Sequence, residues 1–215
     1  MGSVRLTKIV SLIPKCNTLA DVGCDHGYVG IEALNTSRVD SVVFVDVSEP
    51  SLNKARQNCP KEHSKRVKYL CQDGLGSLVV DCAVIAGMGG LETISILECA
   101  EQLPSKLILQ PMRNQKDVRE YLQDKYEIVT DVKFYDGKYY DLIYAERSDS
   151  PTKLTELELE YGKTNVANPS SDFVSYLQEE LVKITNYPIY PNEPKLQARA
   201  NTIHKLIAEY LAKKS

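Results

Sequence analysis

Residues 18–30 read Thr-Leu-Ala-Asp-Val-Gly-Cys-Asp-His-Gly-Tyr-Val-Gly, and this stretch decides the fold. Thr18 to Val22 is a short, mostly apolar run that ends in glycines and acids, and a helix-like segment from Val29 to Leu34 follows it. The pattern predicts a strand, a loop and a helix. In an open parallel sheet, ligands bind at the carboxyl ends of the strands, and a glycine in such a turn lets a ligand approach the backbone closely.

The spacing of the glycines indicates which ligand the loop would bind. Gly23, Gly27 and Gly30 are four and three residues apart, which is not the Gly-x-Gly-x-x-Gly spacing of dinucleotide sites. Asp21 precedes the loop and Asp25 lies inside it, and two carboxylates would repel a pyrophosphate. A cationic ligand fits better, and the Asp-x-Gly-x-x-x-Gly pattern resembles the S-adenosylmethionine loop of class I methyltransferases. The alternative is an ordinary glycine-rich turn between a strand and a helix.

The composition is that of a globular protein with one full-sized domain and an appendage. The chain has 215 residues, of which 43% are hydrophobic and 26% charged, and these values argue against global disorder. No apolar run is long enough to cross a bilayer and the N-terminus lacks a signal-peptide core, so we expect a cytoplasmic protein without membrane contact. The six cysteines are scattered without a Cys-x-x-Cys pair, so we expect free thiols and no metal.

The charge of the chain does not by itself point to a nucleic acid. The net charge is −3, so an RNA contact would need a local group of basic residues. Two such groups occur along the sequence, and they are Lys61, Lys65, Arg66 and Lys68, and Arg113, Lys116 and Arg119. The simpler interpretation of each group is a solvated surface.

The first 150 residues continue the alternation of strands and helices. A helix is predicted over 3–14, and helices are also expected from 49 to 58, from 91 to 101 and up to 122. Strands are predicted over 18–22, 41–46, 66–71, 81–86, 106–110, 127–130 and 141–146. The last two form a hairpin, so the last strand should be antiparallel. We therefore predict an α/β, Rossmann-like fold with a seven-stranded, mostly parallel sheet.

Acidic residues follow the second and third predicted strands. Asp46 ends the second strand, where a carboxylate can accept from both hydroxyls of a ribose. It could instead cap the next helix, but Ser48 is better placed to do so. Asp73 and Gly74 follow the third strand, at the position where class I methyltransferases hold adenine. An ordinary Asp-Gly turn is the alternative there.

Three glycines in four residues follow the fourth predicted strand, in the segment 87–90. They indicate a close approach of the backbone to a ligand, although tight packing of a helix on a strand would also require them. Methyltransferases that act on the exocyclic nitrogen of adenine usually carry Asn/Asp-Pro-Pro-Tyr at this position. This sequence does not, which argues against that chemistry.

From residue 151 the strand pattern stops and long amphipathic stretches begin. Two apolar stripes are expected to face each other, and they are Phe173, Leu177, Leu181 and Ile184, and Leu196, Ala200, Ile203, Ile207 and Tyr210. We predict an antiparallel, coiled-coil-like helical hairpin over 151–215 and a ligand-binding domain over 1–150. The eight basic and eight acidic residues of the tail balance, so it is not a polybasic segment.

Several motifs together resemble the bacterial TrmK family. They are Arg5-Leu6, ADVGCDHGYVGI at 20–31, QDGL at 72–75, IAGMGG at 85–90 and LILQPM at 107–112. The resemblance covers nearly the whole chain. It implies an S-adenosylmethionine-dependent enzyme that methylates N1 of the adenosine at tRNA position 22. We also expect the protein to be a monomer and its helical tail, which follows the last strand and lacks site glycines, to contact tRNA.

The resemblance and the strand ends together give the expected site residues. Those expected to bind the cofactor are Asp21, Gly23, Cys24, Gly27, Asp46, Val47, Asp73, Gly74, Ala86, Gly87 and Met88. Those expected to bind the substrate are Arg5, Gly89, Gly90, Gln110, Pro111 and Arg113.

Three residues of the first loop are expected to act in catalysis, mainly by positioning the base. Adenine N1 has an in-plane lone pair that is mostly unprotonated near neutral pH, so alignment matters more than a strong base. Tyr28 could stack on the base and Asp25 could accept from its N6 amine, while His26 could hold the base or make a structural hydrogen bond. The alternatives are a small-molecule or protein methyltransferase and a non-catalytic RNA-binding protein.

Overall fold

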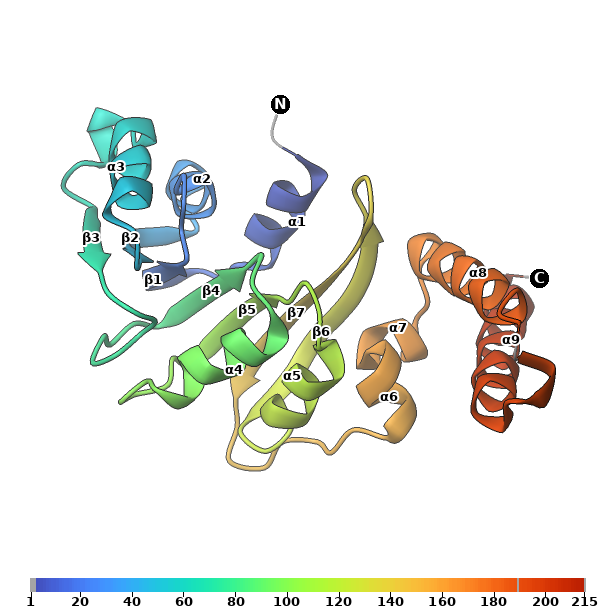
Figure 1. The fold of residues 1–215 in the computed structure, drawn as a ribbon. Helices are drawn as coiled ribbons and strands as arrows, with labels where there is room; N and C mark the ends of the chain where they lie inside the picture. Colours follow the sequence, from blue (N-terminus) through green and yellow to red (C-terminus); the bar gives the residue numbers. More distant parts are fainter. Residues whose placement is uncertain (1–2, 189, 215) are drawn as a thin grey trace.

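The computed structural model of the protein describes residues 3–188 and 190–214 and contains a seven-stranded sheet (Figure 1). The strands are β1 (Cys16–Val22), β2 (Val39–Asp46), β3 (Val67–Cys71), β4 (Cys82–Ala86), β5 (Lys106–Gln110), β6 (Tyr126–Tyr135) and β7 (Tyr139–Arg147). Their order is β3-β2-β1-β4-β5-β7-β6, in which β1 to β5 are parallel and β7 is antiparallel to both neighbours. The predicted mostly parallel sheet with an antiparallel last strand is confirmed.

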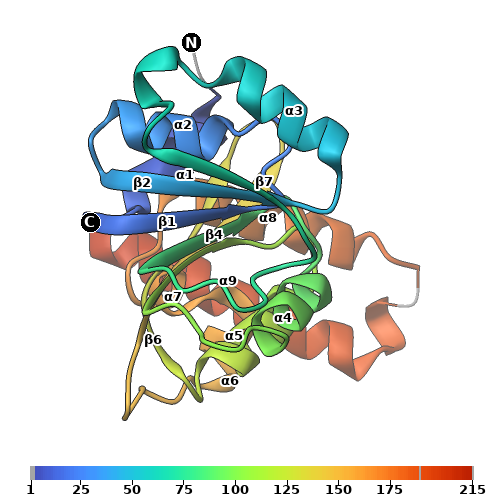
Figure 2. The ribbon, with the colours of Figure 1, turned by 90° about the vertical axis from the view of Figure 1, so that its left-hand side faces the viewer.

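Helices cover both faces of the sheet (Figure 2). One face carries α1 (Val4–Leu12), α2 (Tyr28–Asn35) and α3 (Glu49–Asn58), and the other carries α4 (Gly90–Glu98) and α5 (Gln115–Leu122). A short 3₁₀ helix (Lys61–His63) precedes β3. The fold therefore has three layers, with the strand ends and their loops free to form a site at the edge.

The core is divided by the sheet into two apolar clusters. Leu19 and Phe44 pack with Ile9 toward α1, α2 and α3. Val22 and Val45 belong to the cluster that contains α4 and α5. Because successive residues of a strand point to opposite faces, a strand covered on both sides is apolar throughout, as these strands are. The strand order reverses at β1, and this is the place where an open α/β sheet leaves a crevice for a ligand.

The last two strands are longer than the sequence predicts. β6 covers ten residues and β7 nine, whereas the predicted segments are 127–130 and 141–146. Polar residues such as Asp131 and Lys133 interrupt the apolar pattern, so the sequence did not predict that β6 continues through them. Both residues are buried in the structure. A register shift between Ile128 and Thr130 lets the strand continue to the turn at the end of the hairpin. Helix α4 is also shorter than predicted, since it ends at Glu98.

The described part of the tail, 151–188 and 190–214, contains four α-helices, two more than the predicted hairpin. Short α6 (Glu156–Tyr161) and α7 (Lys163–Ala167) come first, and α8 (Ser171–Thr185) and α9 (Pro194–Lys214) follow, with a 3₁₀ turn (Tyr190–Asn192) between them. The helices α8 and α9 lie antiparallel. Lys213, near the end of α9, accordingly lies beside the start of α8 and donates to the carbonyl of Ala167 (3.1 Å). The hairpin itself is thus present, from 171 onward.

The core of the hairpin contains most of the predicted stripe residues. Its buried members are Tyr161, Phe173, Leu177, Ile184, Ala200, Ile203 and Leu206. Leu206 is 3% exposed and was not in the predicted stripe, whereas the neighbouring Ile207 is only partly buried. The period of 3.6 residues places both on the inner side of α9.

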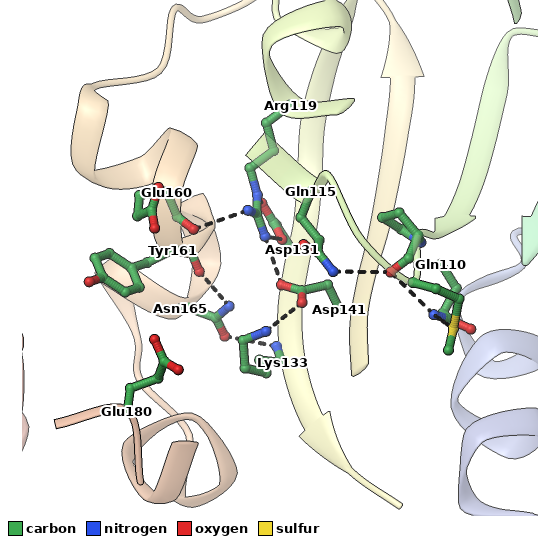
Figure 3. Close-up of polar contacts among 12 residues, drawn as sticks. Gln110, Gln115, Arg119, Asp131, Lys133, Asp141, Glu160, Tyr161, Asn165 and Glu180 are labelled. Carbon is green, nitrogen blue, oxygen red and sulfur yellow. Dashed lines mark hydrogen bonds and ion pairs between the residues drawn. The ribbon is translucent and has the colours of Figure 1, made fainter. Parts of the chain in front are cut away.

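A buried charged network joins the tail to the sheet (Figure 3). The Arg119 guanidinium donates to both oxygens of Asp131 (2.7 and 3.0 Å) and to Asp141 (2.9 Å), and Lys133 pairs with Asp141 as well. Arg119 also donates to the backbone carbonyl of Leu159 in α6 (3.1 Å). Burial alone would lower the pKa of Arg119, but the two carboxylates outweigh it and raise that pKa above its ordinary value.

The network corrects one interpretation and bears on another. Arg119 is 0% exposed, so it cannot belong to a basic RNA-contacting surface with Arg113 and Lys116. The division at residue 150 stays a prediction, and the segment 152–167 is attached to the first domain by hydrogen bonds as well as by the network.

The outer edge of β6 is covered by side chains of the tail. The backbone N–H groups of every second residue donate to them: Asp131 to Thr164 (2.9 Å), Lys133 to Asn165 (3.0 Å) and Tyr135 to Asp172 (3.1 Å). An additional strand at this edge would otherwise accept hydrogen bonds from these three N–H groups. Across both described ranges, no helix combines the length and the apolar character needed to span a membrane.

Candidate active site

A cavity of about 950 Å³ opens at the carboxyl edge of the sheet. It lies between α1, the loop after β1 and the ends of β2, β3 and β4. Thirteen of the predicted cofactor and catalytic residues line it, namely Asp21, Gly23, Cys24, Asp25, His26, Tyr28, Asp46, Val47, Asp73, Gly74, Ala86, Gly87 and Met88. Gly27 is the one member of those two predicted sets that does not.

The glycine loop is shaped by close contacts at two of its glycines. Gly23 has φ +67°, and a Cβ built there would lie 1.9 Å from Cε of Met88, so the Met88 side chain lies directly over the loop. Gly27 has φ +71° and packs against Ala55 and Phe44, away from the cavity. Its absence from the cavity therefore follows from the tight packing of the loop on α3 and β2.

Asp21 is a buried carboxyl group that holds the start of α2. It is 4% exposed and accepts a hydrogen bond from the backbone N–H of Gly30 (2.9 Å). Burial raises the pKa of Asp21 to about 7, with a smaller contribution from the Asp46 carboxylate. A carboxyl group that titrates near neutral pH beside a cavity responds strongly to the charge of a ligand.

We expect the binding of a cationic amino-acid ligand to release protons from Asp21. The positive charge favours the ionised form, so at pH 7 the group, with its pKa of about 7, should lose roughly half a proton, and affinity should rise as the pH increases from 6 to 7. Calorimetry with S-adenosylmethionine, which carries both a sulfonium and an ammonium group, measures this release at pH 7 in buffers of different ionisation enthalpy. An equal apparent enthalpy in all buffers, or the same release from Asp21→Asn, would contradict the assignment.

The Asp46 carboxylate connects two loops at the cavity wall. One oxygen accepts from the N–H of Asp25 (3.1 Å) and the other from the N–H of Ser48 (2.9 Å). The Ser48 side chain accepts from Ser51 N–H at the N-terminus of α3, as the sequence suggested. Each carboxylate oxygen of Asp46 keeps a further lone pair with which to accept a hydroxyl of a ligand.

Asp25 is exposed and paired with a lysine that the sequence reasoning missed. Its side chain is 56% exposed, Lys54 of α3 donates to it (2.9 Å), and the His26 ring nitrogen lies 3.5 Å away. The hydrogen bond from Lys54 is the main reason that the pKa of Asp25 is lowered. No motif marks Lys54, because its contact with the loop spans 29 residues and depends on how α3 packs.

The side chains of His26 and Tyr28 form a stacked pair at the mouth of the cavity. Their rings are 5.2 Å apart and nearly parallel, at 3°, and Tyr28 is 54% exposed. The backbone carbonyl of His26 accepts from Asn58 (3.0 Å), which ties the loop to the end of α3. An exposed ring supported from behind is a surface on which a flat base can stack.

Cys24 lines the cavity but is not a nucleophile. Its side chain is buried, and burial followed by the negative charges of Asp21 and Asp46 raises the pKa of its thiol to about 12. The thiolate is therefore not formed near neutral pH. Among the described residues, no group of three or more His, Cys, Asp and Glu side chains could hold a metal ion.

Helix α1 forms one wall of the cavity and brings Arg5 to it. The Arg5 Nε donates to the buried Gln110 side chain (2.7 Å), and the guanidinium lies beside Gly87. Arg5 was expected among the substrate-binding residues, and the structure places it in the lining of the cavity with Leu6 and Ile9. The contact spans 105 residues, which is why sequence alone did not indicate it.

The other predicted substrate-binding residues lie outside the lining of the cavity. Gly89 contacts the Arg113 guanidinium, and Gly90 packs against backbone carbonyls of the loop before α5. Pro111 is buried and Gln110 reaches the cavity only through Arg5. None of them lines the cavity, and their contact with a substrate stays a prediction.

Comparison with known proteins shows which family this chain is similar to. A family model described as a methyltransferase domain matches residues 2–143. The tRNA (adenine(22)-N(1))-methyltransferase of Bacillus subtilis (strain 168) is 30% identical over 169 residues, which cover 74% of this chain and 71% of that protein.

Solved structures give the same picture over the whole chain. M. capricolum TrmK, in complex with the cofactor product S-adenosyl-homocysteine, superposes with a TM-score of 0.82 at 27% identity and covers 98% of both chains. A Streptococcus pneumoniae protein, a candidate tRNA (m1A22) methyltransferase in complex with S-adenosyl-L-methionine, has a TM-score of 0.84 at 26% identity, with 96% of this chain and 100% of that chain covered. The chain therefore belongs to the TrmK family of tRNA (adenine(22)-N(1))-methyltransferases.

Proposed function

We propose that this protein transfers a methyl group from S-adenosylmethionine to N1 of an adenosine in tRNA, at position 22, and so forms 1-methyladenosine. The observation that carries the proposal is the cavity at the carboxyl edge of the sheet, where Asp21, Asp46 and Asp73 come together beside the glycine loop. Relatives with this fold are named for the same reaction, and two of their structures hold the cofactor or its product.

The cavity suits a cationic nucleoside. We assign the ribose hydroxyls to Asp46, the adenine to Asp73 and Gly74, and the ammonium group to the neighbourhood of Asp21. A volume of about 950 Å³ lies at the upper end of the range for small-molecule sites, roughly 300–1,000 Å³, which leaves room for a base beside the cofactor. S-adenosylmethionine, when bound, supplies an electrophilic methyl group on a sulfonium.

The residues of the chain then have to position the target base. N1 lies on the Watson–Crick edge, so the adenosine must be flipped out or already unpaired. Tyr28, stacked on His26, offers a ring for the base, and Asp25 can accept from the N6 amine. The N6 protons become more acidic as the ring turns cationic, so this hydrogen bond strengthens toward the transition state.

We expect Asp25→Asn to lower kcat about 10-fold with little change in cofactor affinity, because it removes one charge-assisted hydrogen bond at an exposed position. Single-turnover kinetics with saturating tRNA and calorimetry with S-adenosylhomocysteine measure the two effects. Asp40→Asn, at an exposed carboxylate near the start of β2, is the matched control. A large rise in cofactor Kd with kcat retained would move Asp25 into the cofactor site.

The reaction itself is tested with two tRNA transcripts that differ only in A22 or G22. With labelled S-adenosylmethionine, label should enter the A22 transcript as 1-methyladenosine, identified by mass spectrometry of the nucleosides, and the G22 transcript should stay unlabelled. Label in both transcripts would refute the position. Label only in small molecules or proteins, or in nothing, would favour the alternative functions.

The tail has a separate part in the proposal. We assign tRNA contact to the tail over 151–215, most of all to its α8–α9 hairpin. The hairpin lies beyond the last strand, and none of its described residues lines the cavity. The protein is expected to act as a monomer, which sedimentation would test.

A further inference from the structure

Three cationic side chains gather over one pair of aromatic rings. The rings of Phe134 and Tyr140 are stacked at 5.7 Å across the β6–β7 hairpin. Lys8 Nζ lies 5.3 Å from the centre of the Phe134 ring, while Arg5 Cζ and Lys138 Nζ lie 5.4 and 5.3 Å from that of Tyr140. We name Arg5, Lys8 and Lys138 the cation cluster.

The three charged groups of the cation cluster form no ion pair with the described residues. Over residues 3–188 and 190–214, none of its three charged groups has a carboxylate within 4.0 Å. The nearby carboxylate of Asp136 accepts from the backbone N–H of Arg5 (2.9 Å) and so fixes the hairpin turn against α1. The faces of aromatic rings attract cations, but the rings have no net charge and cannot neutralise the three positive charges of the cluster.

The cation cluster lies directly beside the cavity. Arg5 lines the cavity, and Lys8 follows it by three residues on α1. Lys138 is exposed at the end of the hairpin, which rises next to α1 (Figure 1). The same hairpin end contacts α8, because Tyr139 donates to Glu179 (2.8 Å). The cluster thus occupies the surface between the cavity and the tail.

We propose that the cation cluster binds the phosphodiester backbone of the RNA next to the nucleotide that enters the cavity. This inference rests on the proposed function, since a base held in the cavity remains joined to phosphates on both sides. Lysines act as point charges toward phosphate, and such contacts fix the register of the RNA without reading its sequence. Negative phosphates would also provide the ion-pair partners that residues 3–188 and 190–214 do not provide.

The test is the double variant Lys8→Gln/Lys138→Gln in the full-length protein, with tRNA binding measured between 50 and 200 mM salt. Affinity at the middle of this range should fall roughly 10-fold, and the slope of log K against log salt should become less steep by about one to two. Affinity for S-adenosylhomocysteine, measured without RNA, should stay at the wild-type value. Circular dichroism verifies the fold, and the single variants serve if the double variant is unfolded.

The control is Lys65→Gln/Lys68→Gln. Both lysines are exposed beside or within β3, at the opposite edge of the sheet, and belong to the basic group that the sequence alone singled out. This variant makes the same change in net charge and should bind tRNA as the wild type does. An equal loss in the control, or wild-type affinity and slope in the Lys8/Lys138 variant, would overturn the inference.

The inference and the proposed function fail separately. Binding does not require methyl transfer, so a wild-type protein that binds tRNA without methylating it refutes the function and still allows the cation cluster to be measured. A protein that methylates A22 normally while the double variant keeps full affinity refutes only the cluster.

Discussion

Replacing Arg119 by methionine should lower the free energy of unfolding by about 3–5 kcal/mol. The side chains of Arg119, Asp131 and Asp141 are at most 3% exposed. Methionine fills similar space but leaves Asp131 as a buried carboxylate with no cation, whereas Asp141 keeps Lys133. An uncompensated buried charge costs far more than the intact pair contributes.

Urea unfolding of the wild type and the variant at pH 7 measures this loss. Lys116→Ala is the matched control, because Lys116 lies on the same helix and also reaches α6, through Glu156 (3.0 Å), but in solvent. It should cost no more than about 1 kcal/mol. The double variant Arg119→Met/Asp131→Leu should recover part of the loss, since it removes the orphaned charge. A double variant no more stable than Arg119→Met alone would show that packing, not charge, determines the effect.

Replacing Asp46 by alanine should weaken the binding of S-adenosylhomocysteine by about 1.5–3 kcal/mol, or roughly 10- to 150-fold in Kd. The variant loses the assigned acceptor for the ribose hydroxyls. It also loses the acceptor for the N–H groups of Asp25 and Ser48, which hold the glycine loop and the start of α3 at the cavity. Both losses act in the same direction.

Calorimetry on the folded variant tests the Asp46 assignment. Asp40→Ala removes an exposed carboxylate from the same strand, at its other end, and should leave Kd unchanged. Unchanged affinity in Asp46→Ala would require the ribose to lie elsewhere in the cavity. If Asp46→Ala binds weakly but Asp46→Asn binds with wild-type affinity, the hydrogen bonds of the loop matter more than the carboxylate charge.

Local sequence was sufficient for most of the fold and for the floor of the cavity. The glycine loop, Asp46 and Asp73 each lie within a few residues of a strand end, so the rule that ligands bind at carboxyl ends places them without any tertiary information. The residues that face the cavity from other elements were harder. Arg5 was expected at the site only from the family resemblance, and nothing in the sequence marked Lys54, because each meets its partner across a long stretch of chain.

Arg119 shows why charge patterning alone misleads. Along the sequence it stands near Arg113 and Lys116 in an ordinary surface helix. Its burial depends on two aspartates of later strands and on carbonyls of the tail, and none of these contacts is periodic. One of these aspartates, Asp131, together with Lys133 interrupted the apolar alternation of β6 and made that strand seem shorter than it is. One buried network thus explains both errors.

The hydrogen bonds along the outer edge of β6 also bear on self-association. An edge strand with free N–H groups is a template on which a second copy can add a strand, and natural proteins block such templates to avoid aggregation. Here Thr164, Asn165 and Asp172 occupy three successive donors of that edge. Besides its proposed contact with RNA, the tail therefore protects the sheet from intermolecular β-pairing. A chain without the tail would expose the edge of the ten-residue strand β6, on which a second molecule could add a strand.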